Sequence, residues 1–138
     1  MPSVEQNKEI VRRWYELYSQ GDIDRLSELH SDNLVSHAIN SPVPEQHGMR
    51  GRQAGRELFA AHRASFPDWR EDIDFMIGEG DLVAVFHTGR GTHRGDFAGR
   101  RATNRPTAVT ALDVIRIDDD GKVVEHWGVN PWQEAQGQ

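Results

Sequence analysis

The architecture of the chain is best predicted from residues 107–129, TAVTALDVIRIDDDGKVVEHWGV. Two apolar runs flank the tetrapeptide Asp118-Asp119-Asp120-Gly121. Asp-Gly between such runs is a strong hairpin signal, because glycine tolerates the positive φ that the turn requires. We therefore expect two antiparallel strands, Thr107–Ile117 and Lys122–Val129.

A second hairpin is predicted upstream. Apolar and charged residues alternate over residues 69–77, which is typical of a half-buried strand. The face shared by its apolar members comprises Trp69, Ile73, Phe75 and Ile77. After the turn Gly78–Asp81 we expect a strand over Leu82–Thr88. Residues 89–105 are rich in Gly and Arg, and we expect them to form a long exposed connection between the hairpins.

The first half of the chain has helical periodicity instead. Ser3-Val4-Glu5-Gln6 is a capping box, and an apolar stripe follows it as far as Gly21, which is expected to end the helix. Asp22 can cap a short second helix, and residues 52–65 predict a third. Residues 33–39 are expected to be extended. Residues 41–44 are expected to be a loop, since proline interrupts helices and central strands.

These elements predict an α+β fold with about three N-terminal helices packed on a curved, four- to six-stranded, mainly antiparallel sheet. The helices can cover only one face of the sheet, so we expect a cone-shaped barrel with an open mouth, where a small ligand would bind. We expect one domain over residues 1–138, with a core of about residues 5–132 and a polar tail over residues 133–138.

Composition excludes several classes of protein. The chain has 138 residues, 22 acidic and 16 basic side chains, a net charge of −6 and no cysteine. The acidic balance argues against nucleic-acid binding. Without cysteine there is no disulfide framework and no thiol catalysis, which suits a cytoplasmic location. No run of about 18 apolar residues predicts a membrane span, and no secretion signal is apparent.

Asp113 and His126 are the first candidates for a catalytic pair. Asp113 interrupts an apolar strand face that includes Val109 and Ala111, and a carboxylate there is costly unless it is paired or used. His126 shares a face with Gly128 on the partner strand, so the two side chains can meet. A carboxylate beside an imidazole could move protons without a metal. The alternative is a structural hydrogen bond that closes the core.

The other histidines are weaker candidates. His37 could be a second polar group at the substrate or a solvated loop residue. His87 lies on the strand face of Val83 and Val85, which faces either the cavity or the outside. The remaining four have expected roles outside the site: His30 and His47 at the surface, His62 as a helix-to-sheet contact, and His93 in the connecting loop.

Aromatic side chains on the helices are expected to form the core and part of the cavity wall. Those we expect to contact the substrate are Trp14, Tyr18, Phe59 and Phe66, together with Trp132 at the mouth. Tyr18 also offers a phenol that can donate to a developing oxyanion. Trp127 is expected on the opposite face of the sheet from His126, which is the outer face. An apolar outer face of this kind predicts a homodimer.

Metal and cofactor motifs are missing from the sequence. No His-Glu-x-x-His motif and no pair of histidines four residues apart occurs, so we expect no metal site. No Gly-rich loop of the dinucleotide- or phosphate-binding type is present, and we expect no cofactor. The Arg100, Arg101 and Arg105 cluster is interpreted as a solvated loop rather than an anion site.

Three segments resemble the SnoaL-like polyketide cyclases, also called ester cyclases, of the nuclear-transport-factor-2-like superfamily. They are residues 91–99 (GTHRGDFAG), 113–117 (DVIRI) and 120–129 (DGKVVEHWGV). The resemblance covers about residues 5–132. It implies the cone fold, cofactor-free acid/base chemistry on a small hydrophobic substrate, and a homodimer.

One departure from the family concerns its acid/base Asp on the last strand. By the match around Glu125–Gly128, that position is Gly128 here, and the family's facing His corresponds to Asp113. Either the carboxylate has moved across the hairpin, or the aldol chemistry has been lost.

We therefore expect a cyclase or isomerase that closes a ring in a polyketide-like or other hydrophobic carbonyl- or epoxide-bearing metabolite. Asp113 would transfer the proton, with His126 as its partner and His37 nearby. The alternatives are a non-catalytic small-molecule-binding or accessory domain, and a hydratase, dehydratase or epoxide hydrolase on the same fold.

Overall fold

The computed structural model describes residues 2–39, 47–97 and 99–129. Within these residues the helices are α1 (Val4–Gln20), α2 (Ile23–Glu28) and α3 (Arg52–Ser65). The side chains and backbones of Ser3 and Gln6 hydrogen bond reciprocally, which confirms the capping box. Gly21, with φ of 74°, ends α1 as predicted. Asp22 caps α2 by accepting from the backbone N–H of Arg25.

Six strands are found in the described part of the chain. They are β1 (His30–Ile39), β2 (His47–Arg50), β3 (Arg70–Glu79), β4 (Leu82–Thr92), β5 (Pro106–Ile117) and β6 (Val123–Val129). They form one sheet in the order β2-β1-β6-β5-β4-β3. The β1–β6 pair is parallel and every other pair is antiparallel. The predicted α+β class and mainly antiparallel sheet are confirmed.

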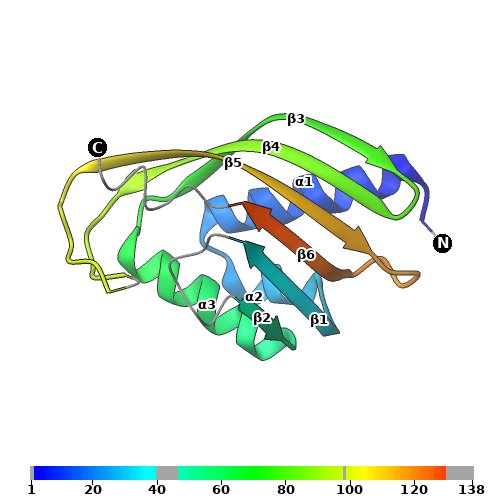
Figure 1. The fold of residues 1–138 in the computed structure, drawn as a ribbon, viewed down its shortest axis with the longest axis horizontal. Helices are drawn as coiled ribbons and strands as arrows, with labels where there is room; N and C mark the ends of the chain where they lie inside the picture. The colour runs from blue at the N-terminus through cyan, green and yellow to red at the C-terminus, as the bar shows by residue number, and fades with distance from the viewer. Residues whose placement is uncertain (1, 40–46, 98, 130–138) are drawn as a thin grey trace.

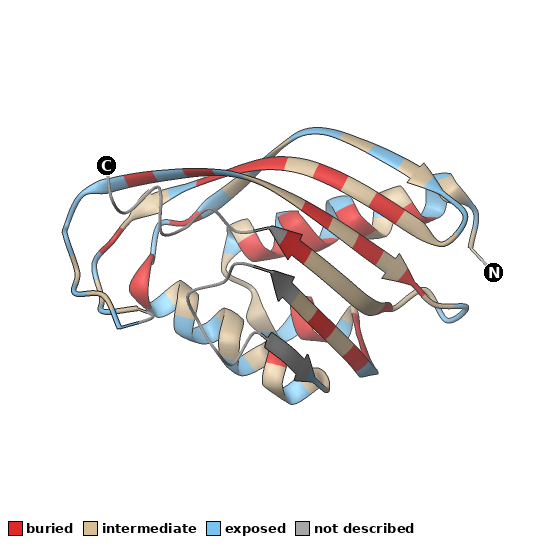
Figure 2. Ribbon diagram, in the orientation of Figure 1, coloured by how far each residue is buried: buried red, intermediate tan, exposed pale blue. Residues whose placement is uncertain are grey.

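The sheet curves around the helices and is not closed, with β2 and β3 at its edges. In Figure 1, α1 lies under the long strands β3, β4 and β5, and α2 and α3 lie beside β1 and β2. Figure 2 shows buried and less buried residues alternating along β4 and β5, as expected for strands with one covered face. The core lies between this face and α1, with Val11, Leu17, Val83, Val85 and Ile115 among its fully buried members.

Strand β3 differs from the sequence prediction in the facing of its side chains. Phe75 and Ile77 are 52% and 61% exposed, whereas Met76 packs against the core. The reason is a bulge between Ile73 and Phe75 in the pairing with β4, because one extra residue reverses the faces that follow it. The prediction that Phe75 and Ile77 share the buried face of Trp69 is therefore wrong.

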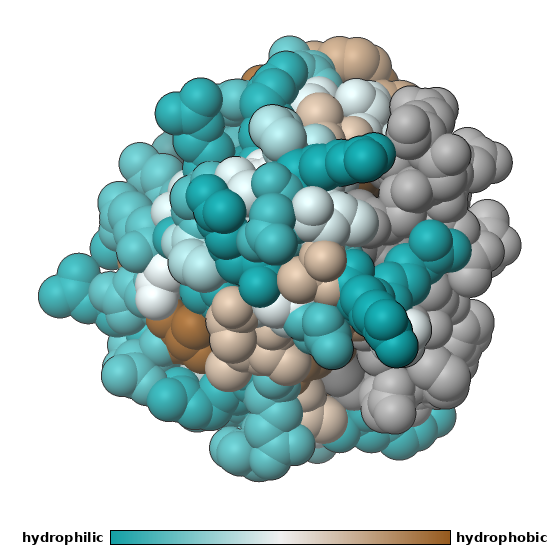
Figure 3. Space-filling model, turned by 90° about the vertical axis from the view of Figure 1, so that its left-hand side faces the viewer, coloured by the Kyte–Doolittle hydropathy of each residue, from teal (hydrophilic) through white to brown (hydrophobic). Residues whose placement is uncertain are grey.

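The connection between the hairpins is shorter than predicted, since β4 continues to Thr92 and β5 begins at Pro106. His93, expected in an exposed loop, is 0% exposed and its ring stacks on Phe66 with centroids 4.9 Å apart. Figure 3 views the molecule from the end at which this connection lies, and hydrophilic side chains predominate among the described residues on that face. Arg101 and Arg105 are exposed there, as expected for a solvated loop.

The predicted loop over residues 41–44 and the polar tail over residues 133–138 lie outside the described residues. Among the described helices, none is long and apolar enough to cross a bilayer.

Candidate active site

A cavity of about 160 Å³ lies between the covered face of the sheet and helices α1 and α3. Its apolar wall includes Trp14, Leu34, Leu58, Phe59, Trp69 and Phe97. An apolar cavity of about 150 Å³ can hold one benzene ring, so this space suits a compact ligand. Polar side chains from β1, β3, β4, β5 and β6 gather on one side of it.

Asp113 is the centre of these polar groups and is 9% exposed. Its Oδ2 accepts a hydrogen bond of 2.5 Å from the hydroxyl of Tyr15 and lies 2.7 Å from Nε2 of His87. The contact with His87 does not have the angular geometry of a hydrogen bond, so we describe it as an ion pair. Its Oδ1 lies 3.1 Å from Nε2 of His126. The carboxylate is thus held on both oxygens, as a buried charge requires.

Gly128 provides the space for the Asp113–His126 contact. It pairs directly with Asp113 across β5 and β6. A Cβ atom at position 128 would lie 2.9 Å from Oδ1 of Asp113 and 3.0 Å from Cε1 of His126. A side chain at 128 and the Asp113–His126 hydrogen bond therefore compete for the same volume.

His126 is held from its other side by Ser36. Nδ1 of His126 lies 3.0 Å from the hydroxyl of Ser36, and the two residues are neighbours in the parallel β1–β6 register. When Nε2–H donates to Asp113, Nδ1 is the acceptor and Ser36 the donor. Ser36, His126 and Asp113 thus form a continuous line of three hydrogen-bonded side chains.

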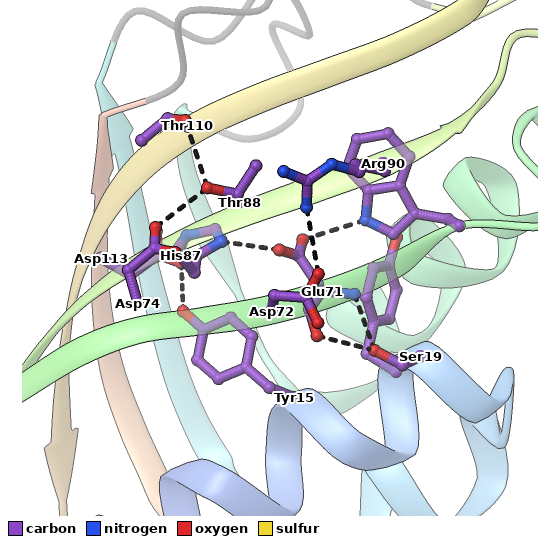
Figure 4. A network of polar contacts seen from close by, with 12 residues as sticks. Tyr15, Ser19, Glu71, Asp72, Asp74, His87, Thr88, Arg90, Thr110 and Asp113 are labelled. Carbon is purple, nitrogen blue, oxygen red and sulfur yellow. Dashed lines mark hydrogen bonds and ion pairs between the residues drawn. The ribbon is translucent and has the colours of Figure 1, made fainter.

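His87 extends the network to a second carboxylate. Nδ1 of His87 lies 2.7 Å from Oε2 of Glu71, and Oε1 of Glu71 accepts from Nε1 of Trp69 at 2.9 Å. Figure 4 shows His87 between Asp113 and Glu71, with Tyr15 approaching from α1. The imidazole of His87 therefore bridges two buried carboxylates.

The charges in this network stabilise one another. Burial by itself disfavours the charged imidazole of His87, but the carboxylates of Asp113 and Glu71 outweigh it and raise its pKa to about 10. Burial likewise opposes the charge on Asp113, yet His126 and His87 hold the pKa of this carboxyl well below its usual range. Burial and the negative charge of Asp113 raise the pKa of Tyr15, so its hydroxyl stays a donor.

Elsewhere on the cavity wall, the hydroxyl of Tyr18 contacts Nδ1 of His62, and the two rings stack 5.6 Å apart. Trp14 donates from Nε1 to Nε2 of His30 at 2.9 Å. His30 and His62 also line the cavity. The expectation that His30 lies at the surface is wrong, because β1 begins at His30 and directs its ring under α1 and α3.

The structure brings together most of the residues that the sequence singled out. Asp113 and His126 meet in the cavity, and its wall includes Trp14, Tyr18, Phe59, His87, Val109, Ala111 and Gly128. His87 thus faces the cavity and not the outer face of the sheet. Trp132 lies outside the described residues.

Two predicted site residues are placed elsewhere. His37 is not at the cavity: its Nε2 lies 2.9 Å from Glu125 and its ring stacks on Trp127, on the opposite face of the sheet. The alternation of β1 directs Ser36, one residue earlier, into the cavity instead. Phe66 is 0% exposed and packs among His62, Trp69 and His93, so it belongs to the core and not to the cavity wall.

Sequence reasoning missed Tyr15, Ser36 and Glu71. Glu71 lies two residues from both Trp69 and Ile73 and so shares their face of the strand. It could therefore have been recognised as a carboxylate on an otherwise apolar face. Tyr15 follows Trp14 directly and lies at the border of the apolar stripe of α1, where periodicity alone does not decide its direction. Among the described residues, no group of three or more His, Cys, Asp or Glu is arranged to hold a metal ion.

Comparison with known proteins identifies relatives of this chain. Residues 8–133 match the family described as SnoaL-like polyketide cyclase. The structure of IdmH from Streptomyces antibioticus is similar over 96% of both chains, with 30% sequence identity and a TM-score of 0.81. Among proteins with curated functions, none matches the sequence.

Two further structures share the fold at lower identity. A protein from Jannaschia sp. CCS1, named as a SnoaL-like polyketide cyclase, has a TM-score of 0.85 and 20% identity, over 99% of this chain and 92% of its own. SalBIII, an epoxide hydrolase/cyclase-like enzyme of pyran ring formation in the polyether salinomycin, has a TM-score of 0.79 and 20% identity, over 96% of each chain.

Proposed function

The chain belongs to the SnoaL-like polyketide cyclase family, and from this premise we propose that it is an acid/base enzyme that works without a cofactor. Its proposed reaction is ring closure or isomerisation of a small hydrophobic metabolite that carries a carbonyl or an epoxide. The observation that supports this proposal is the Asp113–His126 hydrogen bond within a cavity whose wall is largely apolar.

The contacts favour His126 as the group that exchanges a proton with the substrate. Asp113 is surrounded by Tyr15, His87 and His126, which stabilise its anion and make it a weak base. Its role in the proposal is to orient the His126 ring and to stabilise the positive charge that the ring acquires. This reverses the roles expected from the sequence, where Asp113 was to transfer the proton.

Ring closure needs few groups if the cavity holds the substrate in a folded conformation. His126 would remove a proton from a carbon beside a carbonyl through Nδ1, directly or by way of the Ser36 hydroxyl. The resulting enolate would attack a second carbonyl of the same molecule, forming one carbon–carbon bond. The imidazolium would then give the proton to the new alkoxide, which returns the His126 ring to its initial protonation state.

An epoxide would be opened by the same groups. Protonated His126 would donate its proton to the epoxide oxygen while an internal hydroxyl attacks the carbon, which breaks one C–O bond and forms another. The neutral imidazole would then take up the proton that the attacking hydroxyl releases. SalBIII, which shares the fold, is described as epoxide hydrolase/cyclase-like, and so this second form belongs in any substrate screen.

The test is incorporation of deuterium from D₂O into a panel of single-ring β-diketones, unsaturated ketones and hydroxy-epoxides, followed by mass spectrometry with product analysis. Asp113→Asn and His126→Gln are expected to lower the exchange or turnover rate by about 10²- to 10⁴-fold, the usual contribution of a general acid or base. His37→Gln is the matched control, because it changes a histidine on the other face of the sheet. Full activity of Asp113→Asn would eliminate this mechanism.

The alternative function is a non-catalytic small-molecule-binding domain. Gly128, which replaces the carboxylate expected from the family resemblance, is the observation in its favour. Against it, the Asp113–His126 contact fills the space beside Gly128 with a carboxylate from the neighbouring strand. Binding of hydrophobic probes with no turnover across the whole panel would favour the binding domain.

The expected homodimer remains a proposal. Phe75 and Ile77 are exposed on β3, and Phe75 stacks on Phe86 with centroids 4.5 Å apart. Trp127 lies on the outer face of β6 beneath Arg116. Sedimentation of the wild type against Phe75→Asp would show whether a second copy covers this face, since a charge there should dissociate the dimer.

A further inference from the structure

The Tyr18–His62 pair lines the cavity but takes no part in the proton transfer proposed above. Tyr18 comes from α1 and His62 from α3, and the Tyr18 hydroxyl contacts Nδ1 of His62. Both side chains line the cavity together with Leu58 and Phe59. The cavity therefore has a second polar feature, contributed by the helices, whereas the Asp113 network is built mainly on the sheet.

Neighbouring rings fix the orientation of His62. Phe66 stacks on it with centroids 4.9 Å apart, and Trp69 and Phe97 meet it edge-on at 4.8 and 5.3 Å. The Tyr18 ring is held in turn by Phe59, edge-on at 5.0 Å. With its ring held by three aromatic side chains and Tyr18, His62 cannot turn its nitrogens freely.

Both members of the pair stay uncharged. Burial, with a smaller contribution from the Arg63 guanidinium, lowers the pKa of His62 to about 3. Burial and the negative charge of Glu71 raise the pKa of Tyr18, and Arg63 opposes this only in part. The pair is therefore unsuited to exchange a proton as an acid or a base near neutral pH.

A count of protons shows what the neutral pair can offer. It holds two polar hydrogens, the Tyr18 hydroxyl hydrogen and one on the His62 ring, and its internal hydrogen bond uses one of them. If Tyr18 donates to Nδ1, the spare hydrogen is on Nε2 of His62. If Nδ1–H donates to Tyr18, the spare hydrogen is on the Tyr18 oxygen. In both cases one N–H or O–H donor is left.

We propose that this spare donor binds a carbonyl oxygen of the substrate, so that the Tyr18–His62 pair forms a carbonyl-binding subsite of the cavity. The inference rests on the proposed function, because it assigns the second half of the same reaction. A carbonyl suits the subsite since it only accepts hydrogen bonds, whereas a hydroxyl would also need an acceptor. A carboxylate is disfavoured by the buried negative charges of Glu71 and Asp113.

The subsite has a direct consequence for chemistry. When a carbon beside the bound carbonyl loses its proton, negative charge develops on the oxygen that the pair holds. A fixed neutral donor in an apolar cavity stabilises such a charge without rearrangement. The pair would thus act on the substrate oxygen while His126 acts on the substrate proton.

The test compares two probes with the same carbon skeleton, acetophenone and ethylbenzene, of which only acetophenone carries a carbonyl oxygen. Binding can be followed by the fluorescence of Trp14 and Trp69, both of which line the cavity. In the double variant Tyr18→Phe/His62→Phe the affinity for acetophenone, relative to ethylbenzene, is expected to fall by about three- to tenfold, the effect of one lost hydrogen bond. An unchanged ratio would overturn the subsite.

Tyr15→Phe is the matched comparison, because Tyr15 and Tyr18 are the only tyrosines in the sequence and both line the cavity. It removes the same atom from the Asp113 network, so turnover should fall while the acetophenone-to-ethylbenzene ratio is kept. Equal loss of that ratio in Tyr15→Phe and Tyr18→Phe would overturn the assignment to the Tyr18–His62 pair.

A measurement on the wild type does not depend on whether the double variant folds. The carbonyl stretch of bound ¹³C-acetophenone should lie at lower frequency than in hexane, as for a hydrogen-bonded ketone. A stretch at the hexane frequency would overturn the subsite. If the stretch is lowered but no member of the substrate panel is turned over, the carbonyl-binding subsite stands and the proposed enzyme function fails.

Discussion

The substitution Gly128→Ala tests the site at a position where an added methyl group would collide with both Asp113 and His126. Its methyl group would lie 2.9 Å from Oδ1 of Asp113, 3.0 Å from Cε1 and 3.3 Å from Nε2 of His126. Ordinary contacts of a Cβ atom begin near 3.4 Å, so each of the two closest atoms must retreat by about 0.4–0.5 Å. Oδ1 cannot move freely, because Oδ2 of the same carboxylate is held by Tyr15 and His87.

The expected result is a longer or broken hydrogen bond between Asp113 and His126. Overpacking of this kind costs about 1–3 kcal/mol of stability. Loss of a hydrogen bond to a charged group costs a further amount of the same order, so turnover should fall by about 10- to 100-fold in the proposed reaction. The free energy of unfolding is measured with urea, turnover with the deuterium-exchange assay, and the His126 ring by its ¹⁵N chemical shifts.

The matched control is Gly128→Ala in an Asp113→Ala background, where the methyl group no longer meets a carboxylate. The stability cost of Gly128→Ala should shrink there by about 1 kcal/mol or more, which a double-mutant cycle detects. Wild-type turnover and unchanged His126 shifts in the single variant, or an equal cost in both backgrounds, would refute the steric reasoning.

Three further outcomes are expected. The raised pKa of His87 means that its stabilising charge is fully present below about pH 6.5 and is lost as the pH rises through about 10. The stability of the wild type over His87→Gln, measured by urea unfolding, should therefore decline across this range by up to about 1.4 kcal/mol per pH unit, and parallel curves would contradict the bridging role. Ser36→Ala removes the donor to Nδ1 of His126 and should lower kcat by about three- to tenfold in the exchange assay, whereas no change would show that the hydroxyl is dispensable. His37→Gln should change kcat less than about twofold, because the ring lies on the far face; a large loss would show that this face reaches the substrate.

The order of the elements other than β2 (His47–Arg50), for which no strand was expected, was predictable because local signals specify it. The Ser3 capping box, Gly21 and the Asp120-Gly121 turn act within a few residues, and the structure has all three. The Asp113–His126 contact was predictable for a similar reason: one hairpin carries both residues, and strand alternation directs both to the same face.

What could not be predicted depends on register between distant segments. The bulge in β3 reverses the faces of Phe75 and Ile77, and nothing in the local alternation marks it. Ser36 faces the cavity and His37 does not, because β1 pairs with β6, which lies some 90 residues away in the sequence. The pairing of β1 with β2 is also irregular between these two residues. Glu71 could be recognised as a carboxylate on an otherwise apolar face, but its link to Asp113 depends on His87 of the neighbouring strand.

The parallel pairing of β1 with β6 also has a consequence for assembly of the protein. The C-terminal hairpin can form early from local contacts, but the hydroxyl that faces His126 arrives from the N-terminal third of the chain, and closing so long a loop is slow. A chain still emerging from the ribosome, or one that has collapsed without docking β1, would have its acid/base pair only partly assembled. The site is therefore complete only after β1 has paired with β6, which is a late, long-range step of folding.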